Sequence, residues 1–177
     1  MKGAVAFVVV ALLAAGCATT TAAVPAAAPA PAVSSAFDPT DVAWLELTVP
    51  MTGNAVAALE LAASHGAATE ATARLLASQR ELLTRLQAAR TRAGLPDTDI
   101  HSGHRMPGLV TEADLIALRD AHGDDFGRRL RPLVRAHLAQ LVVLSRGEQQ
   151  SGSEPGVRAL AVDVAKAAQA QQDLVRG

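Results

Sequence analysis

The stretch LLASQRELLTRL, residues 75–86, decides the fold class because its apolar residues recur with helical spacing. One face of the helix carries a set of leucines with the polar Gln79 in its middle: Leu75, Leu76, Leu82, Leu83 and Leu86. The opposite side carries Arg, Glu and Thr, as expected of a solvent-facing surface. The stretch therefore predicts an amphipathic helix that enters a helical core through a stripe containing one amide.

The composition extends this prediction to the whole chain of 177 residues. Hydrophobic residues make up 50% of the sequence but aromatic residues only 2%, so any core must be built from Ala, Leu and Val. Strands favour aromatic and β-branched residues, and hence packed helices are the expected class. The formal net charge is −1, with acids and bases interspersed, a pattern typical of solvated helix surfaces and not of a nucleic-acid partner.

Four further helices are expected around this stretch. Asp38-Pro39 predicts the start of the first, which ends at His65-Gly66, and the helix of residues 75–86 extends from about Thr69 to Gly94. A short third helix opens at Thr111, a fourth starts near Asp124, and a fifth begins at Ser153-Glu154-Pro155. The residues expected to point inward on the first, fourth and fifth helices are Val42, Leu45, Val49, Thr52, Val56, Leu59 and Ala63; Phe126, Leu130, Leu133, His137, Leu141 and Leu144; and Val157, Leu160, Ala161, Val164, Ala168 and Val175.

The two halves of the chain have similar layouts. Each has a long helix, a glycine-containing turn and a second helix with a glutamine on its apolar stripe. That glutamine is Gln79 in the first half, and one of residues 169, 171 and 172 in the second; Thr52 and His137 occupy matching places on the long helices. The predicted architecture is an antiparallel four-helix bundle with internal duplication and one short extra helix, spanning residues 37–177.

The N-terminal segment has the form of an export signal. Residues 1–17 contain Lys2, a run of apolar residues and then Ala14-Ala15-Gly16-Cys17, in which Cys17 is the only cysteine of the chain. This resembles a bacterial lipobox and predicts lipidation of Cys17, which would anchor the protein to the outer face of the cell membrane, or to an outer membrane. Residues 18–36 are rich in Ala and Pro and predict an extended tether. The alternative is an ordinary secreted protein whose signal contains a cysteine.

The stretch between the second and third helices carries the candidate metal ligands. His101, His104 and Met106 lie within six residues, and imidazole together with thioether suits Cu(I) or Ag(I). A rigid site would need a fourth donor from the bundle, for which Met51 and His137 are the candidates. The alternative is a solvated loop that is anchored by Met106-Pro107.

The segment that follows these ligands resembles a known family. Residues 106–115 (MPGLVTEADL), 117–119 (ALR) and 123–126 (GDDF) are similar to the family called domain of unknown function 305, and the resemblance covers about residues 37–177. It implies an exported, ferritin-like four-helix bundle that is often rich in Met and His. In some members the family is linked to copper or silver binding.

The resemblance is weaker at the family's own metal ligands. The family carries a His-His pair on each long helix; the matching runs here are TVPMT (48–52) and LVRAH (133–137), so only His137 remains. The Gln-x-x-Glu-Ile element is altered to QREL (79–82) and QQDL (171–174). We expect His137 to be a core residue hydrogen-bonded to an inward glutamine, and its replacement by Leu to be tolerated or mildly stabilising.

These features favour a non-catalytic protein. The chain lacks the Glu-x-x-His of di-iron bundles, a Gly-x-Ser-x-Gly elbow and a phosphate-binding loop. The expected function is that of a membrane-tethered structural or interaction module of the cell envelope, with no certain cofactor and with a protein partner that the sequence does not identify. The alternative is a weak copper- or silver-binding lipoprotein that uses His101, His104 and Met106, with Met51 or His137 as a further donor.

Overall fold

The regular elements of the computed structural model, which describes residues 32–101 and 103–175, are all helical. This confirms the predicted all-α class. The elements are α1 (Pro39–Ser64), α2 (Glu70–Ala93), α3 (Glu112–Arg119), α4 (Asp124–Ser151), α5 (Pro155–Gln172) and a short 3₁₀ helix η1 (Asp173–Val175).

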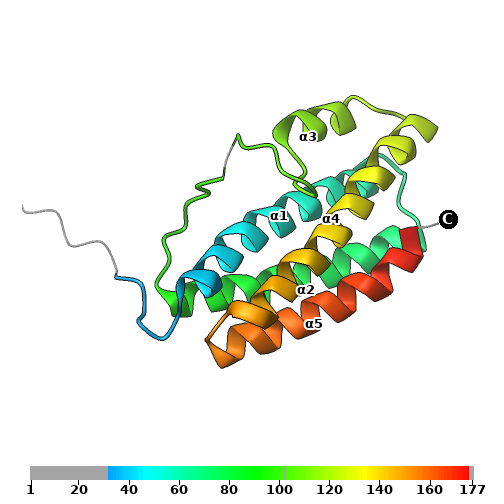
Figure 1. The fold of residues 1–177 in the computed structure, drawn as a ribbon. Coiled ribbons are helices and arrows are strands. Elements are labelled where there is room, and N and C mark those ends of the chain that lie inside the picture. Colours follow the sequence, from blue (N-terminus) through cyan, green and yellow to red (C-terminus); the bar gives the residue numbers. More distant parts are fainter. Residues whose placement is uncertain (1–31, 102, 176–177) are drawn as a thin grey trace, which may run out of the picture. The chain divides into compact units, whose positions relative to one another are not determined.

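The long helices form an antiparallel four-helix bundle (Figure 1). α1 packs against α2 and α4, α4 packs against α5, and α2 meets α5 on the remaining side. Asp41, in the first turn of α1, accepts a hydrogen bond from Ser153 in the turn after α4, so α1 and α4 run in opposite directions. The bundle therefore consists of two helical hairpins, as the internal duplication predicts, while the short α3 lies against α1 and α4.

Local sequence explains where the helices begin. Asp38, Thr69 and Thr111 each cap a helix, with a side chain that accepts from a backbone N–H of the first turn. In all three cases the third helical residue bonds back to the cap residue and completes a capping box. A cap of this kind contributes about 1 kcal/mol to stability. α2 ends at Gly94, whose φ of 73° is the left-handed conformation that glycine adopts without strain.

The core consists of small aliphatic side chains, as the composition predicts. Ala55, Ala58, Ala89 and Ala161 are fully buried, which lets neighbouring helix backbones approach closely. The prediction for Ala63 is wrong: Ala63 is exposed and Ala62 is buried. In the last turn of α1 the inward position falls three residues after Leu59, because a period of 3.6 alternates steps of three and four.

α1 also has the length and composition of a membrane-spanning helix, with a mean hydropathy of 1.2 over its most apolar window. In the bundle, 56% of that window is buried against the other helices. Its apolar character is accounted for by its place in the core, where it contacts α2, α3 and α4.

Candidate functional site

A chain of hydrogen-bonded polar side chains crosses the middle of the core. His137 Nε2 lies 3.1 Å from Gln79 Oε1, Gln79 Nε2 donates to Gln171 Oε1 over 2.8 Å, and Gln171 Nε2 donates to Ser78 Oγ over 2.6 Å. The chain joins α4, α2 and α5. It confirms that His137 is a core residue bonded to an inward glutamine, and it identifies Gln171 as the glutamine of the second half. With the amides oriented in this way, Nε2 of His137 carries the proton and donates it to Gln79.

His137 is held as a neutral imidazole. Only 1% of the residue is exposed, and this burial lowers its pKa to about 4, against a smaller opposing effect of the nearby Gly108 backbone. Its second nitrogen, Nδ1, has no hydrogen-bond partner of standard geometry among the described residues. Near neutral pH the side chain therefore carries no charge into the core.

Thr52 occupies the matching place in the other half of the bundle. It lies eleven residues after Asp41 on α1, and His137 lies eleven residues before Glu148 on α4; Asp41 and Glu148 are in contact. Because an α-helix rises 1.5 Å per residue, Thr52 and His137 are at the same level of this antiparallel pair. Thr52 is fully buried, and its Oγ1 has no hydrogen-bond partner in the described part of the chain. The equivalent positions of the two halves thus lie side by side, and one holds a threonine while the other holds a histidine.

The long loop between α2 and α3 reaches the same region. Arg90 holds its start by donating to the backbone oxygens of Pro96 and Thr98, and Asn54 holds its end by donating to the Val110 oxygen over 2.8 Å. At Gly108, with φ of 75°, an added Cβ would lie 2.8 Å from the Ala136 oxygen of α4. The loop backbone therefore packs directly against α4 beside His137.

His101 and His104 are brought together at the loop surface. Their ring centroids are 5.8 Å apart, and both line a hollow of about 500 Å³ together with Arg105. With a metal–nitrogen distance of about 2 Å, two imidazoles that share one ion have centroids up to about 6 Å apart, so the spacing suits a shared ion. The Arg105 guanidinium in the same hollow opposes a bound cation, whereas the carboxylates of Asp99 and Glu112, which also line it, attract one.

The other predicted ligands do not join this pair at the surface. His101 is half-buried and His104 is exposed, whereas Met51 and His137 are each only 1% exposed in the core. Met106 is half-buried. Cys17, the predicted lipidation site, lies outside the described residues. Within residues 32–101 and 103–175, no three His, Cys, Asp or Glu side chains gather in the arrangement of a metal site.

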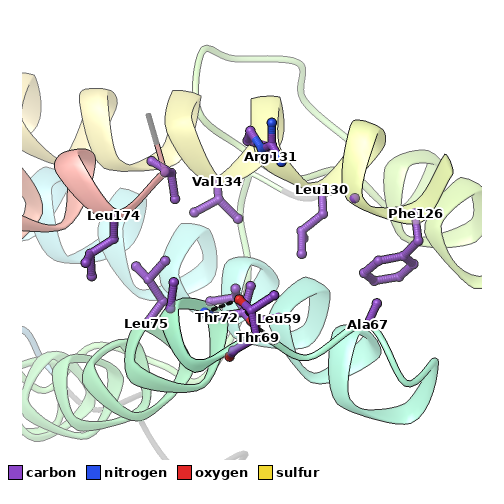
Figure 2. Close-up of a pocket in the computed structure, with 13 residues that line it drawn as sticks. Leu59, Ala67, Thr69, Thr72, Leu75, Phe126, Leu130, Arg131, Val134 and Leu174 are labelled. Atoms are coloured by element: carbon purple, nitrogen blue, oxygen red, sulfur yellow. Dashed lines mark hydrogen bonds between the residues drawn. The ribbon is translucent and has the colours of Figure 1, made fainter. Parts of the chain in front are cut away.

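An apolar cleft opens between α1, α2 and α4 (Figure 2). Its volume is about 160 Å³, and Phe126, Leu130 and Val134 of α4 face Leu59 and Leu75 across it. This is the size of a cavity that holds a small apolar molecule such as benzene.

The sequence analysis missed a pair of buried carboxyl groups, Asp41 and Glu148. They are 0% and 1% exposed. The spacing of both residues could have shown that they point into the core. Asp41 lies four residues before Leu45 and Glu148 seven residues after Leu141, which places both on the inward stripes of their helices.

Comparison with known proteins supports the fold. Residues 41–176 match the family described as Domain of unknown function (DUF305). The chain is also similar to the crystal structure of a DUF305 fragment from Deinococcus radiodurans, with a TM-score of 0.71 and 19% sequence identity over 83% of this chain and 97% of that chain. At this level of identity the similarity concerns the fold alone. A search of curated proteins found no match.

Proposed function

We propose, from the premise that the chain belongs to the domain of unknown function 305 family, that it is a non-catalytic helical-bundle module held at the cell envelope by a lipid anchor. In this proposal the domain serves a structural or interaction role and has lost most of the metal ligands that the family resemblance implies. The membrane is its partner through the anchor, and the bundle presents its outer surface to other envelope components.

The observation that carries this proposal is the hydrogen bonding of His137. This residue is the only one of the implied His-His ligands that remains, and its Nε2 is used by Gln79. Its bonded neighbour is the amide of Gln79, a hard donor that does not fit Cu(I) or Ag(I). The core site therefore favours a structural role for His137 in a bundle without bound metal.

The anchor is tested at Cys17. In cells given a labelled fatty acid, the protein is expected to become labelled and to fractionate with membranes. A Cys17→Ser variant should lose the label and appear in the soluble fraction. Equal membrane association of the Cys17→Ser variant would contradict a lipid anchor at this residue.

The second candidate function is weak binding of Cu(I) or Ag(I) by the loop. The spacing of His101 and His104 favours it, and Met106 follows them in the same loop. Affinity is limited by the entropy lost when a loop is ordered. A competition titration of the protein against a Cu(I) chelator tests this function.

The titration separates three outcomes. Weak binding that falls sharply in a His101→Ala, His104→Ala, Met106→Leu triple variant supports the loop site. Tight binding that survives the triple change moves the site to Met51 and His137 in the core. An absence of detectable binding by the wild-type protein leaves the envelope module as the only function that we propose.

A further inference from the structure

Two carboxyl groups meet beneath the turn between α4 and α5. Asp41 comes from the first turn of α1 and Glu148 from the last turn of α4. A Cβ added to Gly152 would overlap the Glu148 carboxyl and come within 2.8 Å of Asp41 Oδ1. The backbone of the turn therefore covers both carboxyl groups and keeps bulk water away from them.

Asp41 has the environment of an ionised carboxylate. It accepts hydrogen bonds from the Asp38 N–H at 2.8 Å, from the N–H and hydroxyl of Ser153 at 3.2 Å, and from the Glu154 N–H at 3.1 Å. Burial acts to raise its pKa, but these bonds and one from Glu148 outweigh that effect, so the pKa of Asp41 is lowered. With its lone pairs used by these donors, Asp41 is poorly placed to bind a metal ion.

Glu148 has the opposite environment. Neither carboxyl oxygen receives a hydrogen bond from an N–H or O–H group of the described residues. Burial, the hydrogen bond to Asp41 and the negative charge of Asp41 together raise the pKa of Glu148 to about 8. A carboxyl that has no donors and lies against a carboxylate can be stable only when it is itself protonated.

The charged groups around the pair do not neutralise Glu148. Asp38 of α1 adds a negative charge, and Arg158 of α5 has only a small opposing effect. Arg92 of α2 lies 3.8 Å from Glu154 and forms its ion pair there. None of these side chains therefore supplies the positive charge that would compensate the two carboxyl groups.

We propose that Asp41 and Glu148 form a buried proton-binding site, in which Glu148 carries one proton and donates it to Asp41. The resulting O–H···O bond fastens the start of α1 to the end of α4. When the proton dissociates to solvent, two carboxylates remain in contact and repel each other. The bound proton thus couples the α1–α4 junction to the pH outside the protein.

The sign of the pH dependence follows from the raised pKa. The stabilisation is fully present below about pH 4.5, the pKa of the unfolded residue, and is lost as the pH rises towards about 8. His137, whose pKa is lowered, titrates below pH 6.5. From pH 6.5 to 8 the stability therefore reports mainly Glu148, because the remaining titration of His137 in the unfolded chain changes the unfolding constant by only about twofold and is the same in every variant that keeps His137.

The experiment compares chemical unfolding of the wild-type protein, Glu148→Gln and the matched control Glu81→Gln, in which an exposed glutamate is replaced. One extra proton bound by the folded state changes the unfolding constant up to tenfold per pH unit, and the change levels off near the folded pKa. The ratio of the wild-type unfolding constant to that of Glu148→Gln should therefore rise about 15-fold from pH 6.5 to 8.

The two variants should differ in this response. The amide introduced by Glu148→Gln keeps a donor for Asp41 and cannot ionise. The unfolding constant of this variant should therefore change much less with pH than the wild-type constant. Glu81→Gln should follow wild type. Equal pH dependence of wild type and Glu148→Gln would overturn the proposal.

A direct readout is the carboxyl carbon shift of Glu148 in an NMR titration of the folded protein. The proposal requires a titration well above the ordinary glutamate range. A midpoint near 4.5, the ordinary value for glutamate, would overturn it, whatever the effect of the substitution on stability.

Discussion

At the scale of single residues, Thr52 and His137 occupy equivalent positions in the two halves of the bundle but affect its stability in opposite ways. His137 donates to Gln79, whereas the Thr52 hydroxyl is buried without a partner among the described residues. A buried polar group with a partner contributes to stability, and one without a partner costs about 1–3 kcal/mol. The two positions should therefore respond to apolar replacement with opposite signs.

We predict that His137→Leu destabilises the protein by about 1–3 kcal/mol, because Gln79 Oε1 is left buried and unpaired. This replaces the sequence-based expectation that the change is tolerated. Thr52→Val should be neutral or stabilising by up to about 1 kcal/mol, since it removes an unpaired hydroxyl at nearly constant volume. Urea unfolding at about pH 7.5, where His137 is neutral in both states, measures both. A cost of more than about 1 kcal/mol for Thr52→Val would show that the hydroxyl has a partner.

At the scale of elements, the long loop between α2 and α3 is fixed by backbone packing at one glycine. Gly108 combines φ of 75° with close contact to α4, where an added Cβ would lie 2.5 Å from Gln140 Cβ. Gly66 has a similar φ of 65° but no atom within 4 Å of its Cβ position. The pair separates the cost of backbone conformation from the cost of a steric clash.

Gly66→Ala should cost about 1–2 kcal/mol, which is the penalty of a left-handed backbone for an L-residue. Gly108→Ala should cost clearly more, because the loop must also move away from α4. Thermal unfolding of the two variants provides the comparison. Equal losses would mean that the contact between the loop and α4 contributes nothing to stability.

The elements also show what could be predicted from the sequence. The caps at Asp38, Thr69 and Thr111 were predictable because each involves atoms only three residues apart. The docking of Gly108 on Gln140 and the meeting of Asp41 with Glu148 were not predictable, since each joins separate helices or loops. The core position of His137 could be predicted from its place on a helical stripe, whereas the surface position of His101 and His104 depends on how the loop packs.

At the scale of the whole molecule, two buried groups set opposite limits on stability. His137 is neutral in the fold, so its contribution is complete above pH 6.5 and is lost as the pH falls to about 4. Glu148 acts in the other direction, and its contribution is lost as the pH rises from about 4.5 to about 8. The two effects partly cancel between about pH 4.5 and 6.5. The bundle is therefore expected to have a broad stability optimum in mildly acidic solution.

The loss of stability in acid that His137 causes can be measured separately with the variant His137→Gln. Its side chain keeps a donor for Gln79 and is not protonated between about pH 4 and pH 7. The pKa of His137 falls from 6.5 to about 4, which corresponds to about 3 kcal/mol. The stability of wild type relative to His137→Gln should therefore fall by about 3 kcal/mol between about pH 7 and pH 4, while Glu148 and the surface histidines cancel in the difference. Unfolding free energies of both proteins across this range provide the measurement. A constant difference would mean that His137 is protonated as easily in the fold as in the unfolded chain, which contradicts its dry, neutral environment.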